Sequence, residues 1–246
     1  MGAIILLLVA AASAYALKFE LDETTVSATA SVEPREFPAR GNVPIDLRSV
    51  IRVKSDDGSA PLALSEIAFN IDGNGFIDTK GLPVCTMAKL AGTTPQAARK
   101  RCADAIVGTG SGKAEVRFPG KAPVQIKSPL TLFNAPPQGG RPAVIAHAYE
   151  TLPVPKAVLV PFTIQKIHDG RYGFRVEIPL PKIAEGYGAA TLAEATVGKT
   201  WKRGGKTVGY ANAHCVGGRL QVYGRLSFAD GSFFPGTLTS PCHVAN

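Results

Sequence analysis

The sequence is poor in the side chains that recognise single-stranded nucleic acids. Its 246 residues include a single Trp, and aromatic residues make up only 7% of the chain. Those aromatic residues do not alternate with basic ones. Proteins that bind single strands without sequence preference combine a basic groove with aromatic side chains on which the bases stack. We therefore expect no specific nucleic-acid partner.

Catalytic and cofactor motifs are also lacking. There is no Gly-x-Ser-x-Gly nucleophile elbow and no close pair of carboxylates of the kind used in glycoside hydrolysis. Asp72–Asp78 begins like a calcium loop, but Ile77 and Pro83 occupy the positions of the EF-hand glycine and final glutamate. The Gly-rich segment 108–113 lacks P-loop spacing and precedes a predicted strand, so we expect a flexible turn there. We predict no catalytic residue, no cofactor and no metal.

The only long hydrophobic run lies at the N-terminus. Residues 3–17 carry no charged side chain, but a membrane-spanning helix needs about 20 residues. Two Ala-x-Ala cleavage frames end this run, at Ala14 and at Ala16. No Lys or Arg precedes this run, although a signal peptide usually has a positively charged region there. The alternative to a cleaved signal peptide is an uncleaved anchor or a buried first strand. We predict a signal peptide over residues 1–16, no transmembrane span in the mature chain, and a secreted or cell-surface location.

Cysteine is scarce, and its four copies fall into two local pairs. An exported protein meets oxidising conditions, so we expect disulfides. Four cysteines allow three pairings, and the simplest links Cys85 to Cys102 across a helical unit and Cys215 to Cys242 at one end of a strand meander. A zinc site made of Cys215, Cys242 and the histidine beside each is the alternative.

The charge balance is basic. The chain has 27 Lys and Arg against 19 Asp and Glu, a net charge of +8. Such a balance favours anionic partners. Most basic residues are scattered along the chain, and only two clusters occur. Residues 99–101 are predicted to lie on the solvent-exposed side of a short helix, and residues 202–206 in a hairpin loop. The partner we expect is an anionic cell-envelope polymer or another surface protein.

Apolar and polar residues alternate over long stretches, which predicts β-strands. Residues 172–180 and 220–228 follow the period-two pattern, and 157–164 is a more continuous apolar run interrupted by Pro161. Nineteen prolines suit loops and edge strands. We predict a mainly β protein built from antiparallel sandwich or barrel-like sheets. The turn signals between strands are Asp57-Gly58, Asp169-Gly170, Gly217-Gly218 and Asp230-Gly231.

One segment has a helical pattern instead. Thr94 is a suitable N-cap, Pro95 suits the first helical position, and residues 96–107 continue as the predicted helix. Its apolar face includes Cys102. Together with the preceding turn, this segment predicts a short helical insertion around residues 86–107.

These patterns divide the chain into four parts. We predict the signal peptide over 1–16, an N-terminal β region over 17–80, the helical insertion within 81–110 and an antiparallel β region over 111–246.

A series of short motifs resembles a group of uncharacterised exported proteins of high-GC Gram-positive bacteria. The resemblance extends from about Pro61 to Cys242. That group has no assigned activity, so the resemblance implies an exported, β-rich, cysteine-paired architecture and transfers no functional residue. The matching motifs are Gly81–Cys85, Ala98–Cys102, Val107–Gly110, Leu132–Asn134 and Ser227–Gly231, followed by the terminal cysteine.

Two classes of function agree with these observations. The favoured class is a non-catalytic exported or cell-surface β protein that binds an envelope polymer or a partner through its loops. The alternative is an extracellular hydrolase with a loop-built site around His147, Glu150 and His168. The absence of a nucleophile motif favours the first class, so we expect that the protein is not an enzyme.

Overall fold

The structure is a computed structural model that describes residues 16–21 and 23–245. Residues 1–15 of the predicted leader, with the cleavage position at Ala14, therefore lie outside the described residues, whereas Ala16 begins the first strand. The described chain is mainly β, as predicted, and twelve strands form one large antiparallel sheet. These strands are β1 (Ala16–Leu21), β2 (Thr24–Glu33), β5 (Asp46–Ser55), β6 (Leu64–Asp72), β8 (Ile106–Val116), β9 (Val124–Gln138), β10 (Arg141–Glu150), β11 (Lys156–Asp169), β12 (Tyr172–Pro179), β13 (Gly188–Val197), β17 (Arg219–Phe228) and β18 (Phe233–Pro241).

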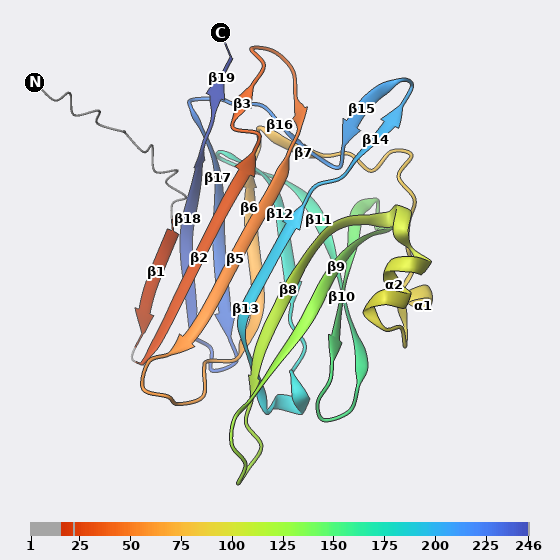
Figure 1. Cartoon of the computed structure of the whole chain (residues 1–246). Helices are drawn as coiled ribbons and strands as arrows, with labels where there is room; N and C mark the ends of the chain where they lie inside the picture. Colours follow the sequence, from red (N-terminus) through yellow and green to blue (C-terminus); the bar gives the residue numbers. More distant parts are fainter. Residues whose placement is uncertain (1–15, 22, 246) are drawn as a thin grey trace, which may run out of the picture.

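The sheet curls back on itself so that its first and last strands approach each other. The strand order is β1-β2-β5-β13-β8-β9-β10-β11-β12-β6-β17-β18. One wall runs from β1 to β9, and the other runs from β10 to β18 behind it (Figure 1). Strands from both predicted β regions share this sheet: β5 pairs with β13, and β6 lies between β12 and β17.

Short strands extend one end of this nearly closed sheet. A three-stranded sheet in the order β4-β16-β7 and the hairpin of β14 and β15 lie at the upper end in Figure 1. The hairpin contains the predicted 202–206 loop. The bounds are β3 (Glu36–Phe37), β4 (Val43–Pro44), β7 (Gly75–Ile77), β14 (Thr200–Arg203), β15 (Lys206–Gly209), β16 (Ala211–Ala213) and β19 (His243–Val244).

The alternating segments form strands where the period-two pattern predicts them. Residues 172–180 correspond to β12, and 220–228 fall within β17. The turn glycines adopt positive φ angles, for example 56° at Gly170 and 90° at Gly231, which glycine tolerates because it has no Cβ.

The turn predicted at residues 108–113 is wrong, because this segment lies inside β8. It pairs with β9 on one side and with β13 on the other. A Cβ on Gly110 would lie 1.9 Å from the carbonyl oxygen of Glu194. Glycine here therefore allows two strands to approach closely and does not mark a turn.

The helical insertion packs against the outer face of β9 and β10. It consists of α1 (Met87–Leu90), α2 (Pro95–Arg101) and the short 3-10 helix η1 (Ala103–Ala105). Thr94 caps α2 as predicted, with Oγ1 accepting the Ala97 N–H at 3.3 Å. The helix ends at Arg101 rather than at residue 107, because Ile106 and the residues after it join the sheet as β8.

Both predicted disulfides are present. Cys85 is bonded to Cys102, and Cys215 is bonded to Cys242, each with a Cα–Cα distance of 5.8 Å. The first attaches α2 to the segment before α1. Neither of the described helices has the length and apolar composition needed to cross a membrane.

Candidate functional site

A long cavity of about 600 Å³ lies between the two walls of the sheet. Its volume is typical of small-molecule sites, which range from about 300 to 1,000 Å³. Because successive side chains of a strand point to opposite faces, each strand contributes alternate residues to the lining. The apolar lining residues include Leu17 and Phe19 in β1, Val26 in β2, Ile51 in β5, Ile67 and Phe69 in β6, Leu130 and Leu132 in β9, Val144 in β10, Val158, Val160 and Phe162 in β11, Val176 in β12 and Leu226 in β17.

Several inward-facing apolar side chains are only half-buried. Leu130, Val160 and Phe162 point between the walls and are still partly exposed. In a close-packed interior such side chains are fully buried. The two walls of the sheet therefore do not interdigitate over this stretch.

Small residues at positions that face the cavity leave the space between the two walls unfilled. Gly112, Ser128, Ala148 and Ala193 line the cavity from four different strands. Gly112 lies opposite Ser128 on one side and opposite Ala193 on the other, so three small residues adjoin in one row. The sequence pattern does not predict this feature, because only the strand register shows that these residues share a row and a face.

One end of the cavity, the closed end, is covered by the three-stranded sheet. Ile77 of β7, Ala211 of β16 and the adjacent Tyr210 line it there. The Tyr210 side chain is 1% exposed, and its hydroxyl has no hydrogen-bond partner within residues 16–21 and 23–245. Burial raises the pKa of Tyr210 well above its usual value, so this hydroxyl is neutral. From Val144 at this end to Glu150 at the other, β10 extends roughly 20 Å at about 3.3 Å per residue.

The opposite end, the open end, lies where neighbouring strands separate. The ladder between β9 and β10 stops at the pair Thr131–His147, and the strands diverge beyond it (Figure 1). Beyond that pair, the Tyr149 N–H donates to Ser128 Oγ at 2.8 Å. Pro129, which has no N–H, lies in β9 beside this separation.

The next strand pair separates in the same direction. Pairing between β11 and β12 ends at Ile164–Val176, three residues from Pro161. Residues 148–158, the lower β10–β11 hairpin, therefore pair with each other, from Ala148–Val158 to Glu150–Lys156, but form no ladder with β9 or β12. Its inward face lines the cavity through Ala148 and Val158.

A buried carboxylate is located at the open end. Glu150 is 6% exposed, and its Oε2 lies 3.1 Å from the Lys156 Nζ. Its Oε1 accepts the backbone N–H of Ala184. Ala184 has a φ angle of 47°, which is uncommon for a residue with a Cβ. Lys182, two residues earlier, also lines the cavity. The open end thus contains one fully paired carboxylate and two lysines.

The structure does not bring together the three residues of the alternative hydrolase site. His147 lies on the outer face of β10, beneath the helical insertion. Glu150 follows three residues later and therefore faces the cavity on the other side of the sheet. His168 lies near the far end of β11, roughly 40 Å along the strand from Lys156.

His147 is held as a neutral side chain. It is 1% exposed, and its Nε2 lies 3.1 Å from both the carbonyl oxygen and the hydroxyl of Thr93. The Thr93 hydroxyl donates to the Leu90 carbonyl at 2.6 Å, so we assign the Nε2–H of His147 as donor to the Thr93 carbonyl. Burial lowers the pKa of His147 below its usual value, and the Arg99 cation lowers it further. His147 thus connects the helical insertion to the sheet.

A second, more polar hollow of about 560 Å³ includes His168 and lies near the β11–β12 turn. His214 also lines it, with Nδ1 2.8 Å from Asn42 Oδ1. No carboxylate is among the described residues that line this hollow. The neighbouring Cys215 is bonded to Cys242, so neither sulfur is available for the alternative zinc site.

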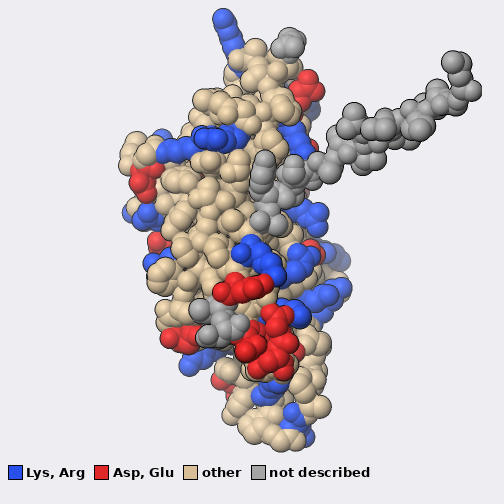
Figure 2. Space-filling model, turned by 90° about the vertical axis from the view of Figure 1, so that its left-hand side faces the viewer, with Lys and Arg blue, Asp and Glu red and all other residues tan. Residues whose placement is uncertain are grey.

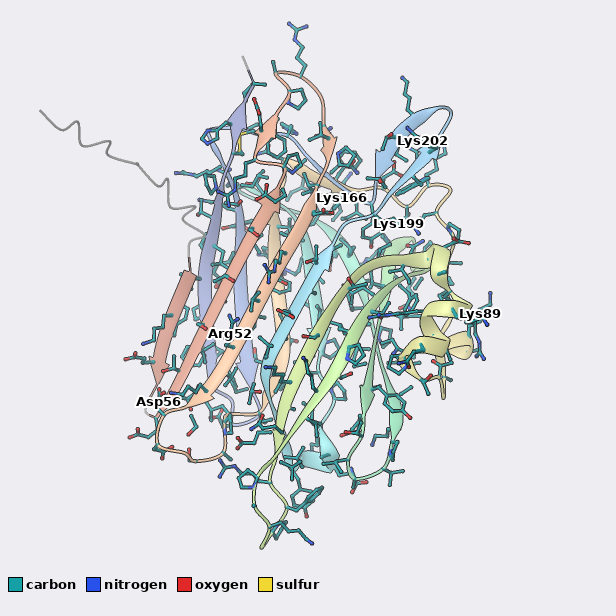
Figure 3. The ribbon with its side chains drawn as sticks, viewed as in Figure 1. Arg52, Asp56, Lys89, Lys166, Lys199 and Lys202 are labelled. Atoms are coloured by element: carbon teal, nitrogen blue, oxygen red, sulfur yellow. A yellow bond between two sulfur atoms is a disulfide. The ribbon has the colours of Figure 1, made fainter. Side chains whose placement is uncertain are left out.

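The basic residues are dispersed over the surface. Lys89 in α1 and Lys202 in β14 project from separate parts of the molecule (Figure 3). In the 202–206 loop, Arg203 Nη2 lies 2.6 Å from Asp78 Oδ2 and holds the pKa of that carboxyl below its usual range. On the face shown in Figure 2, basic and acidic side chains are intermixed.

No known protein family, curated protein or solved structure matches this chain. The apolar cavity is the candidate functional site that the geometry itself identifies.

Proposed function

We propose that this protein is an exported, non-catalytic binding protein that carries an elongated apolar ligand inside its sheet. The observation that carries this proposal is the apolar cavity between the two walls, which is covered at one end and has separated strands at the other.

The hydrophobic effect favours an apolar chain in this cavity. Each methylene group transferred from water contributes about 0.8 kcal/mol, and the half-buried side chains of the walls gain contacts that they lack without a ligand. A polar ligand would lose its hydrogen bonds to water and find few partners along the lining. The anionic polymer expected from the net charge therefore does not suit the cavity, and a polymer or protein partner for the outer surface stays a separate prediction.

The disulfides and the leader support export. Two disulfides are the usual state of exported proteins and are rare in the reducing cytosol. The apolar leader with its two cleavage frames favours the same location.

The single tryptophan provides a direct assay. Trp201 is partly buried and packs against the apolar cluster at the closed end of the cavity. We expect titration with 1-dodecanol, an uncharged chain, to change the emission of Trp201 and to saturate at one ligand per protein.

Matched variants test where the ligand binds. Ala148→Phe and Val160→Phe place extra volume inside the cavity and should weaken dodecanol binding at least about ten-fold, since each excludes several methylene groups. Ala68 lies between two inward-facing residues of β6 and hence points outward, so Ala68→Phe is the control. The proposal fails if dodecanol does not bind, or if all three variants bind it as the wild type does while circular dichroism shows intact folds.

The non-catalytic part of the proposal has its own test. A screen over ester, glycoside and peptide substrates should give no rate above background. A reproducible wild-type rate that is lost in His147→Ala at an unchanged melting temperature would establish the hydrolase alternative.

A further inference from the structure

The charges at the open end bear on the chemistry of the ligand. On the basis of the proposed function, we infer that the ligand is an anionic single-chain amphiphile: its chain lies in the cavity, and its carboxylate or other anionic head group binds at Lys156 and Lys182.

The open end of the cavity carries more positive than negative charge. Glu150 is the buried carboxylate there, and both of its oxygens are already engaged, one by the Lys156 ammonium and one by the Ala184 N–H. Lys182 lines the same end and forms no ion pair with any described residue. One paired carboxylate and two lysines leave an excess of one positive charge at this end. The other charged residues of the lining, Lys113 in β8 and Glu194 in β13, have opposite charges and do not change this balance.

Both lysines have hydrogen-bond donors available for a ligand. An ammonium group has three N–H donors, and the Lys156 side chain is 50% exposed although it contacts Glu150. Donors therefore remain free on Lys156 as well as on Lys182. A head group with several acceptor oxygens would bind both lysines, and charge-assisted hydrogen bonds are stronger than neutral ones.

These charges lie directly beside the apolar lining of the cavity. Lys156 begins β11 and Glu150 ends β10, so the two form the last pair of the lower β10–β11 hairpin and flank its connecting loop, residues 151–155. The β9–β10 ladder is interrupted beside them, and the next inward residues, Ala148 and Val158, are apolar. A ligand that enters between β9 and β10 would keep its head group at the lysines while its chain extends towards Tyr210.

The experiment compares three probes that share one chain and differ in head group: dodecanoate, 1-dodecanol and dodecyltrimethylammonium. Binding is followed by Trp201 emission at low ionic strength. We expect dodecanoate to bind most tightly and the cationic probe least tightly. Added salt should weaken dodecanoate binding, because it screens exposed charges, and should leave dodecanol unaffected.

Two variants should change dodecanoate affinity in opposite directions. Lys182→Gln should weaken it roughly two- to five-fold, the usual range for a partly exposed ion pair. Glu150→Gln keeps an acceptor for Ala184 but frees Lys156, and should strengthen dodecanoate binding by a similar factor. Lys202→Gln, in the hairpin at the closed end (Figure 3), is the control and should have no effect.

The outcomes separate this inference from the proposed function. If none of the three probes binds, the proposed function fails. If all three bind equally, or if Lys182→Gln weakens dodecanol as much as dodecanoate, the cavity binds apolar chains but the head-group inference is wrong. Dodecanoate binding that is weakened by Tyr210→Phe and unchanged by Lys182→Gln would place the head group at the closed end and would also overturn the inference.

Discussion

The aromatic rings of Phe19 and Phe234 pack together with their centroids 5.7 Å apart, across the seam between the first and last strands of the sheet. Phe228 meets Phe234 edge-on at 5.5 Å. β1 and β18 are the two ends of the strand order and are not hydrogen-bonded neighbours. Side-chain packing, together with the bond from the Val32 N–H to Ser240 Oγ, therefore holds the seam closed.

Packing at the seam predicts that replacing Phe234 lowers the free energy of unfolding strongly, whereas replacing its neighbour Phe233 lowers it only slightly. Phe234→Ala should lower the free energy of unfolding by about 3–5 kcal/mol, because it removes a buried ring from the seam. Phe233→Ala should cost less than about 1 kcal/mol, since that ring is 50% exposed and the Arg225 guanidinium lies over it at 4.2 Å from the ring centroid. Urea unfolding of both variants measures the difference. Equal losses would contradict this role for the seam.

Each disulfide should stabilise the fold independently. Replacing Cys85 and Cys102 by Ala should lower the free energy of unfolding by about 3 kcal/mol, because the bridge restricts a loop of 17 residues in the unfolded chain. Replacing Cys215 and Cys242 should have a similar effect. Non-reducing peptide mapping should recover the two local pairs. A crossed pair, or free thiols in exported protein, would show that the framework is different.

Acid should destabilise the contact between the helical insertion and the sheet. The pKa of His147 is lowered in the folded state, so the unfolded chain binds more protons as the pH falls through about 6.5, the usual histidine value. The stabilisation is complete above that pH and is lost progressively below it. The melting temperature should therefore fall between pH 7 and pH 5, and His147→Gln should make this fall smaller.

The control for this pH effect is an exposed histidine. His243→Gln, on β19, should leave the pH dependence unchanged. A wild-type melting temperature that is constant from pH 7 to pH 5 would contradict the prediction.

Processing of the leader should leave the cavity lining intact. Cleavage after Ala14 or Ala16 retains Leu17 and Phe19, which line the cavity. N-terminal sequencing of protein recovered from the culture medium or envelope should therefore begin at Tyr15 or Leu17. An intact Met1 on cytosolic protein would disprove export.

The features that the sequence predicted correctly depend on residues close together in the chain. The alternation in β12 and β17, the hairpin loop at 202–206, the Thr94 cap and the two local disulfides all follow from neighbours or from short separations. Local backbone preferences and side-chain period are sufficient for them.

The cavity depends on the tertiary structure and could not be predicted from the sequence. Gly112, Ser128 and Ala193 are unremarkable in the sequence, and they form one row only because β8 pairs with both β9 and β13. The same pairing turned the Gly-rich segment 108–113 into a strand. Register between distant strands determines which small residues face one another, and no local pattern encodes it. The sequence by itself therefore specified the strands and the two disulfides, whereas the cavity between the walls results from how those strands are paired.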